Sequence, residues 1–535
     1  MSKKLLFFLT SVVILSLLFA GCSGSQSSSG NTSSSNTSNT SSNSSGKKDN
    51  TLTVAVDENF ISMDPHDTND TLSFSAQKTM YQGLFGFNKS MEVVPILAKD
   101  YKVSKDGTVY TINLKKEIQF QDGAPFNAKA VKVNIDRLAN PENHLKRHSL
   151  YAMVKATKVV DDDTVKIILK QPFGAFINNL AHPAGMMISP KALKKWGKKV
   201  SKHPVGTGPF KFKEWIPGDH LTVVKNKNYW EKGYPKIDQI TFKPVPENGS
   251  RTAMLKTGEA DFIYPVPPEQ AKQIDGKNGI TVQAKPSIIV QYLSMNTMKK
   301  PFNDPKVRKA INYAINKKAY IKVVNNGFGK ILDSVIAPKT QYYSKQQVYK
   351  YNPQKAKQLL KEAGYPNGFS TSVWGENNST TMKGMQFLQQ QLSKVGIKVK
   401  IVPMESGTMS SKIWGVQSPQ KAKVELYYGG WSPSTGDADW GIRPLLSGTA
   451  FPPNAYNTAY YNNPKVTKLI NKAMRTSDPN QRKTLYSKIQ KMIWNDAPWA
   501  FLTVEDTLAG KKDYVKGVYL LPDGSLSTHD AEIAK

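Results

Sequence analysis

Well-capped helices that alternate with strands after Ser287 restrict the fold of this chain more than any other feature. An Asp or Asn directly before Pro marks a helix start, because the polar side chain caps the first turn and Pro suits its first position. Four such pairs occur after Ser287: Asp304-Pro305, Asn352-Pro353, Asn463-Pro464 and Asp478-Pro479. A further helix is predicted from Ser379 to Gly396, followed by a strand from Ile397 to Val402. This alternation predicts an α/β fold with a parallel or mixed sheet covered by helices.

The first half of the chain is richer in strands. Alternation of apolar and polar residues predicts strands at 52–56, 110–114 and 165–169. One helix interrupts them, with Asn127 as its cap and an apolar stripe behind it. The chain has 535 residues, whereas one hydrophobic core rarely serves more than about 300. At least two lobes are therefore expected.

The N-terminus has the pattern of an exported, lipid-anchored protein. Lys3 and Lys4 precede an apolar run that ends in small residues and is too short to span a bilayer, which predicts a signal peptide at 1–21. Cys22, the single cysteine, stands where a bacterial lipoprotein is acylated. Residues 22–49 are mostly Ser, Asn and Thr, which predicts a flexible tether. The predicted location is the extracellular face of the bacterial cell membrane.

The charge balance is strongly basic but does not indicate nucleic-acid binding. The formal net charge is +32, and only seven of the 73 basic residues are Arg, the residue best suited to phosphate and base contacts. The lysines are spread along the chain, without a basic helix or an RNA-binding motif. We interpret them as a solvated surface that faces an anionic cell envelope.

No catalytic or metal-binding motif is found in the sequence. His144 and His148 have the spacing of a helical metal pair, but the Glu of a zinc-protease motif is missing. The chain also lacks a nucleophile elbow, a phosphate-binding loop and a dinucleotide fingerprint. We therefore expect no enzymatic activity, no metal and no cofactor.

The segment from Tyr427 to Trp440 has an unusual composition. It combines three Gly and one Pro with four aromatic residues and two carboxylates. Gly and Pro predict a loop here rather than a helix or a central strand. Aromatic rings supply contact area and carboxylates bind cations, so this loop is a candidate edge of a ligand site. A hydrophobic plug that closes a surface loop is the alternative.

Several phrases of the sequence resemble the bacterial family 5 extracellular solute-binding proteins, which are the peptide-, glutathione- and nickel-binding components of ABC importers. These phrases lie at 81–85, 97–107, 120–126, 206–210, 302–308, 313–316 and 361–368. The segments 181–184, 379–396 and 430–440 resemble the glutathione-binding branch most. The resemblance extends over roughly residues 50–535.

This resemblance implies a two-lobed periplasmic-binding-protein-like fold of type II (cluster C) with an extra domain. Lobe I would comprise residues 50–85, 205–285 and 505–535, the extra domain 86–204, and lobe II 286–504. The implied function is that of a monomeric substrate-binding lipoprotein. It would capture a short peptide, with glutathione as the leading candidate, by hinge closure and deliver it to the permease and ATPase subunits of an importer.

Family position also implies a set of ligand contacts. Dipeptide- and oligopeptide-binding relatives hold the peptide amine with an Asp about three residues after a Gly-Trp pair, where this chain has Ser434. The carboxylates of this chain come later in the segment, so we expect them to bind a different ligand amine. The implied contacts are Tyr292, Asn296, Trp374, Asn378, Tyr427, Trp431, Ser434, Asp437 and Asp439. Ordinary packing, or a solvated loop, is the alternative for each of them.

Three other functions stay open at this point. The first is a general dipeptide- or oligopeptide-binding protein without a preference for glutathione. The second is a cell-wall adhesion protein that uses the basic charge, which steep salt dependence of attachment would reveal. The third is a secreted peptidase, which would need a nucleophile–base pair or a metal set that the sequence does not contain.

Overall fold

The structure, a computed structural model, describes residues 50–534. The predicted signal peptide at 1–21, the predicted lipidation site Cys22 and the predicted tether at 22–49 lie outside the described residues. None of the helices between residues 50 and 534 combines the length and the apolarity that a membrane crossing requires.

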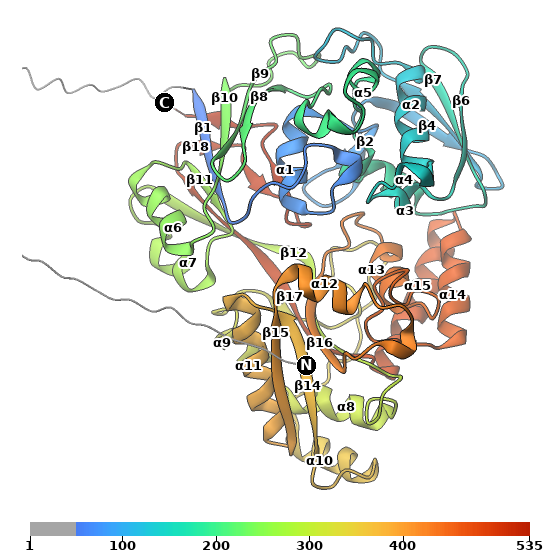
Figure 1. Cartoon of the computed structure of the whole chain (residues 1–535), viewed down its shortest axis with the longest axis vertical. Coiled ribbons are helices and arrows are strands. Elements are labelled where there is room, and N and C mark those ends of the chain that lie inside the picture. Colours follow the sequence, from blue (N-terminus) through green and yellow to red (C-terminus); the bar gives the residue numbers. More distant parts are fainter. Residues whose placement is uncertain (1–49, 535) are drawn as a thin grey trace, which may run out of the picture. The chain divides into compact units, whose positions relative to one another are not determined.

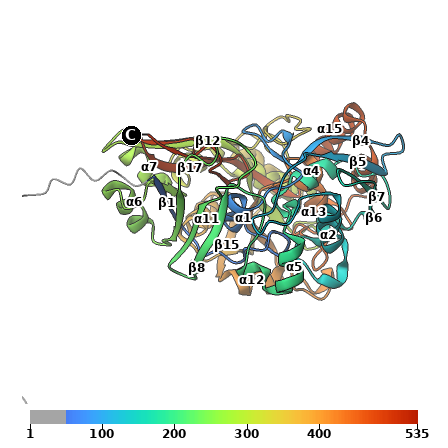
Figure 2. The same ribbon diagram turned by 90° about the horizontal axis from the view of Figure 1, so that it is seen from above.

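The largest sheet has 11 strands and mixes parallel with antiparallel pairs (Figure 1). Two long antiparallel strands, β12 (Ile280–Met295) and β17 (Trp499–Lys512), occupy its middle and lie side by side in both Figure 1 and Figure 2. On one side of this pair lie β15 (Ile397–Met404), β14 (Phe369–Glu376) and β16 (Leu426–Trp431). On the other side lie β11 (Phe262–Tyr264), β1 (Thr51–Val56), β10 (Gln239–Pro244), β9 (His220–Lys225) and β8 (Phe210–Ile216), and β13 (Lys330–Ile331) pairs with β17.

The pair β12–β17 joins the two halves of this sheet. The register between the two strands shifts between Pro286 and Val290, where a proline cannot donate a ladder hydrogen bond. Beyond the shift, Val290 to Met295 also pair with β16, whereas the residues from Ile280 to Pro286 pair with β17 alone. The two strands therefore contribute to both halves of the sheet.

A second sheet has four antiparallel strands in the order β4 (Ala98–Val103), β5 (Val109–Leu114), β7 (Thr164–Leu169) and β6 (Val154–Val159). Helix α2 (Ala128–Ala139) packs on it through an apolar stripe, and Asn127 caps this helix as predicted. Three short pairs complete the strands: β2 (Phe85–Phe87) with β3 (Val93–Pro95), β18 (Val515–Lys516) with β21 (Glu532–Ile533), and β19 (Tyr519–Leu520) with β20 (Leu526–Ser527).

The predicted caps are confirmed, because each of Asp304, Asn352, Asn463 and Asp478 accepts a hydrogen bond from the backbone of the helix that follows it. These helices are α8 (Pro305–Ala314), α10 (Pro353–Glu362), α14 (Pro464–Arg475) and α15 (Pro479–Asp496). The predicted helix at 379–396 is α11 (Ser379–Ser393), which packs on β14 and β15. The remaining α-helices are α1 (Thr71–Met80), α3 (His148–Tyr151), α4 (Phe176–Ala181), α5 (Pro190–Trp196), α6 (Asn248–Thr257), α7 (Pro268–Ile274), α9 (Lys317–Val323), α12 (Ser406–Ile413) and α13 (Ala438–Leu446). Short 3-10 turns occur at Pro65–Asp67, Pro141–Asn143, Pro183–Gly185, Gly197–Lys202 and Pro419–Lys421.

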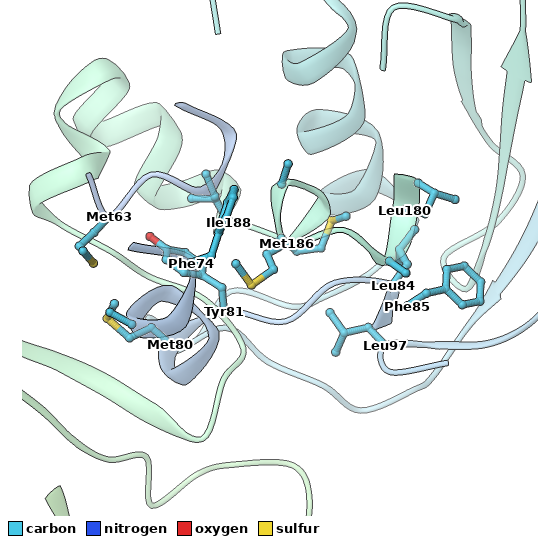
Figure 3. Packing of buried hydrophobic residues seen from close by; sticks show 14 of the residues in the cluster. Met63, Phe74, Met80, Tyr81, Leu84, Phe85, Leu97, Leu180, Met186 and Ile188 are labelled. Atoms are coloured by element: carbon cyan, nitrogen blue, oxygen red, sulfur yellow. The ribbon is translucent and has the colours of Figure 1, made fainter. Parts of the chain in front are cut away.

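One hydrophobic core extends from β1 to α2. Leu52 and Val54 of β1 belong to the same buried cluster as Val131 and Ile135 of α2. Figure 3 shows part of this core, where Phe74 and Tyr81 lie near Met186 and Ile188, and Leu180 lies near Leu84 and Phe85. The predicted extra domain at 86–204 thus shares a core with the predicted lobe I, and the exact domain boundaries stay a prediction.

The prediction of a loop from Tyr427 to Trp440 is wrong. Its first part is strand β16, which lies between β14 and β12, and its last part opens helix α13. The aromatic residues favour a strand, and the glycines allow it to pack closely: a Cβ at Gly430 would lie 3.0 Å from the carbonyl oxygen of Val290. Only the turn between Trp431 and Asp437 remains a loop.

Candidate functional site

Two adjoining hollows form the candidate ligand cleft. The small pocket, of about 200 Å³, is lined by Asn69, Thr71, Phe74, Arg147, His182, Pro183, Gly430, Trp431, Ser432, Ser434, Trp440, Asp523 and Ser525. The large pocket, of about 810 Å³, shares Thr71, Ser432 and Asp523 with it. The small pocket takes lining residues from α1, from the start of α3, from the turn after α4, from the stretch that runs from β16 into α13 and from the C-terminal segment, and the large pocket adds residues of α6, α7, α11 and β17. Distant parts of the chain therefore build the cleft.

Arg147 brings a positive charge to the small pocket. Its Nε donates a hydrogen bond to the Thr68 carbonyl oxygen at 2.8 Å, and its guanidinium lies over the Phe74 ring, 5.2 Å from the centroid. No other hydrogen bond or ion pair of this side chain is found within residues 50–534. Burial lowers the pKa of Arg147, although a guanidinium stays charged at neutral pH. The guanidinium therefore has donors available for a ligand.

Asp523 brings a negative charge to the same pocket. This residue is 3% exposed, and its Oδ1 accepts hydrogen bonds from the backbone N–H of Ser525 at 2.9 Å and from the Ser525 hydroxyl at 2.7 Å. The Lys78 ammonium in turn donates to the Ser525 hydroxyl oxygen at 2.6 Å. Burial lowers the pKa of Lys78, an effect that the Asp523 carboxylate opposes. In the part of the chain that the structure describes, no group donates a hydrogen bond to the second Asp523 oxygen.

Trp431 and Trp440 supply apolar contact area to the small pocket. Their ring centroids are 5.9 Å apart, and the Trp431 indole N–H donates to the Trp440 carbonyl oxygen at 3.0 Å. Tyr456 lies against Trp431 with 5.3 Å between the centroids. The rings hold one another in place, which suits a rigid wall for a ligand.

Among the charged residues that line the large pocket, acidic groups outnumber basic ones. Burial raises the pKa values of Asp57, Glu58 and Glu505 there, and neighbouring carboxylates raise that of Glu58 further. Arg251 and Lys383 line the same space as positive groups. A ligand in the cleft would therefore meet both signs of charge.

Three of the expected ligand contacts line the cleft. Trp431 and Ser434 lie in the small pocket, and Asn378 lies in the large one. The Asn378 side chain also caps α11, because its Oδ1 accepts from the Thr381 backbone N–H at 2.9 Å. For these three residues, ligand contact stays our proposal.

Four other expected contacts do not line the cleft. Tyr292 stacks on Trp499, with 3.9 Å between the ring centroids, and Tyr427 packs edge-on against Trp414. Asn296 is 1% exposed and donates to the Val424 carbonyl oxygen, while Trp374 packs on the same core as Tyr292. Packing or local hydrogen bonds account for these four side chains in this arrangement, and ligand contact stays a prediction for them.

Asp437 and Asp439 do not line either pocket, and both carboxylates are engaged in ion pairs. Asp437 is fully buried and accepts two hydrogen bonds of 2.8 Å from Arg482. Burial alone would lower the pKa of Arg482, but the Asp437 carboxylate outweighs it and raises this pKa. Asp439 accepts from Arg443 at 2.7 Å and 2.9 Å. Neither carboxylate is available to a ligand amine in this arrangement.

The site contains residues that the sequence did not predict. Arg147 and Asp523 lie in no segment that the sequence analysis singled out, whereas Trp440 lies in the 427–440 segment and His182 in the 181–184 segment without being named there as a ligand contact. His144 and His148 do not share a helix face, since His144 precedes α3 in a left-handed conformation. No group of three or more metal-ligating side chains is present among residues 50–534.

Known proteins resemble this chain over most of its length. Residues 92–453 match the model of the bacterial extracellular solute-binding proteins, family 5. The glutathione-binding protein GsiB of Pectobacterium atrosepticum is 47% identical over 90% of this chain and 94% of its own, and GsiB of Escherichia coli O157:H7 is 46% identical over the same shares.

Solved structures agree with the sequence relatives. The periplasmic binding protein DppA from Helicobacter pylori, in complex with the peptide STSA, has 30% identity and a TM-score of 0.78, covering 91% of this chain and 98% of its own. A dipeptide-binding protein from Pseudoalteromonas sp. SM9913, in complex with Met-Leu, has 27% identity and a TM-score of 0.80, covering 90% and 100%. The α/β fold is thus the two-lobed fold of periplasmic binding proteins, and the chain belongs to the bacterial extracellular solute-binding proteins, family 5.

Proposed function

We propose that this protein is the substrate-binding component of an ABC importer and that it captures glutathione, or a closely related short peptide, in the cleft. The observation that carries the proposal is the small pocket, where Arg147, Asp523 and two Trp rings lie together. Such a pocket complements a small zwitterion, because it offers one group of each charge and apolar area between them. The relatives named as glutathione-binding support glutathione as the first ligand to test.

The cleft also suggests how binding is coupled to transport. Thr71 and Asp523 belong to the predicted lobe I, whereas Trp431 and Ser434 belong to the predicted lobe II. A ligand that contacts both sides stabilises the arrangement in which they are close, and β12 and β17 are the strands across which a hinge would act. The ligand-bound form would then dock on the permease and its ATPase.

The predicted anchor fits this role. Acylation at Cys22 would hold a monomeric binding protein at the extracellular face of the membrane. A flexible tether of the length of 22–49 reaches about 26–32 Å by random-coil statistics. The protein would thus stay within reach of its permease.

The size of the large pocket favours a second candidate. Its volume of about 810 Å³ could hold several residues of a longer peptide. A general dipeptide- or oligopeptide-binding protein without a preference for glutathione would use both pockets.

Isothermal titration calorimetry with the purified full chain tests the proposal. We expect glutathione to bind with one site per chain and Arg147→Met to weaken binding about 30-fold, since a lost charge-assisted hydrogen bond costs about 2 kcal/mol. Arg475→Met, on α14 and outside the small pocket, is the matched control and should bind like the wild type. Equal affinity for glutathione and trialanine would favour the second candidate, and no binding of glutathione or any short peptide would overturn both.

A further inference from the structure

Ser434 and His182 form a hydrogen-bonded pair in the small pocket. The His182 Nε2 and the Ser434 Oγ are 3.0 Å apart, and both residues line the pocket. His182 is 1% exposed and begins the turn after α4, while Ser434 lies between β16 and α13. Asn178 of α4 donates to the Thr435 carbonyl oxygen at 2.9 Å, so a second bond holds the two segments together.

The neighbours of His182 determine which of its ring nitrogens carries the proton. The backbone N–H of Ala184 donates to Nδ1 at 3.0 Å, so Nδ1 is an acceptor and carries no proton. Burial, together with the charges of Arg147 and Lys78, lowers the pKa of His182 well below its usual value, so the ring is neutral. The single ring proton is therefore on Nε2, which donates to the Ser434 oxygen.

This direction makes the Ser434 hydroxyl a donor toward the pocket. Its oxygen accepts from His182, and within residues 50–534 its own proton has no acceptor. Arg147 adds further donors at the same pocket, and the Phe74 ring contacts the Arg147 guanidinium and packs nearly perpendicular to the His182 ring. A ligand ammonium would meet a like charge here, whereas a carboxylate would meet matching donors.

We propose that Arg147 and Ser434 bind the free α-carboxylate of a γ-glutamyl residue, that Asp523 binds its α-ammonium group, and that His182 is the positioning residue that makes Ser434 a donor. An α-amino acid carries both charges on one carbon, and one pocket of about 200 Å³ contains both partners. An α-linked peptide has an N-terminal ammonium group without this carboxylate. The inference rests on the proposed function and predicts a preference for γ-linked peptides.

Titration calorimetry with two matched ligands tests the carboxylate. Glutathione is compared with 4-aminobutyryl-Cys-Gly, which keeps the γ-amide chain and the amine but lacks the α-carboxylate. We expect the wild-type full chain to bind the analogue at least 30-fold more weakly, and α-Glu-Cys-Gly about 100-fold more weakly, than glutathione. If glutathione binds but the analogue binds equally well, this inference is overturned while the proposed function stands.

Variants of Ser434 test the donor. Ser434→Ala should weaken glutathione binding about tenfold and change the affinity for the analogue less than twofold, whereas Ser434→Thr, which keeps the hydroxyl, should restore most of the glutathione affinity. Loss of affinity for both ligands alike in Ser434→Ala would contradict a carboxylate contact. Ser434→Asp should raise the affinity for trialanine and lower that for glutathione.

A spectroscopic measurement tests His182 without altering the fold. The ¹⁵N NMR signals of its ring should report the neutral form with the proton on Nε2. A protonated ring, or a proton on Nδ1, would overturn the positioning role. His182→Gln should weaken the binding of glutathione and leave the affinity for the analogue almost unchanged, as Ser434→Ala does. If His182→Gln does not fold, the NMR signals and the Ser434 variants still test the positioning role of His182.

Discussion

At the scale of single residues, the environment decides whether a carboxylate serves stability or binding. Asp437 and Asp523 are both buried acids, at 0% and 3% exposure. Asp437 meets Arg482 in a paired, two-bond contact, whereas Asp523 faces the small pocket with one oxygen free of hydrogen bonds from described residues. We therefore assign Asp437 a role in folding stability and propose Asp523 as a ligand contact.

Asp437→Asn should lower the free energy of unfolding by about 3–5 kcal/mol, because it leaves the buried Arg482 without its partner. Asp439→Asn is the control: its partner Arg443 is 30% exposed, so water can solvate the guanidinium and the loss should be smaller. Urea unfolding measures both variants. A stable Asp437→Asn protein with an altered ratio of affinities for glutathione and its α-linked isomer would instead restore Asp437 as a ligand contact.

At the scale of elements, close backbone contacts fix the helix that carries Thr71 and Phe74 to the cleft. The C-terminal end of α1 rests on the Gly206-Thr207-Gly208 segment, whose Gly208 N–H donates to the Met80 carbonyl oxygen at 2.9 Å. A Cβ at Gly208 would lie 2.5 Å from the Met80 carbonyl carbon and 2.7 Å from the Thr79 carbonyl oxygen. Both atoms are backbone and cannot rotate away.

Gly208→Ala should therefore destabilise the protein by about 1–3 kcal/mol, the usual cost of overpacking. In the matched variant Gly249→Ala, the nearest atom is the end of the flexible Glu247 side chain at 3.1 Å, so little loss is expected. The midpoints of urea unfolding compare the two variants. Equal midpoints would show that α1 can shift without cost.

At the scale of the whole molecule, the predicted anchor lies outside the part of the chain that holds the candidate cleft. Residues 50–534 contain no helix suited to a membrane crossing, and Cys22 precedes the predicted tether. The net charge of +32 allows weak attraction to an anionic envelope, but salt screens such attraction.

Cys22→Ala should release folded, ligand-binding protein from the membrane fraction, because acylation is then impossible. Ser25→Ala, which leaves the cysteine in place, is the control and should stay membrane-bound. Fractionation at low and high salt, followed by immunoblotting, measures the distribution. Salt-resistant retention of Cys22→Ala would place the anchor elsewhere.

Local signals made much of the fold predictable from the sequence. The caps Asp304, Asn352, Asn463 and Asp478 act within one helical turn, so their effect depends on neighbours in the chain. The strand and helix periods around 110–114 and α11 are likewise set by residues a few positions apart. The segments that resemble family 5 predicted the two-lobed fold, and the comparisons with known proteins confirm this prediction.

Only the tertiary structure decided which polar residues face the cleft. Family position predicted Ser434 as a ligand contact, but nothing near Arg147, His182 or Asp523 in the sequence indicates that they line the same pocket. The sequence predicted Asp437 as a ligand contact, whereas in the structure its carboxylate pairs with Arg482 of another helix. Strand β16 formed despite its glycines because β12 pairs with it along its whole length. In each case a partner distant in sequence determines the outcome, since burial and pairing energies depend on which segments meet in space.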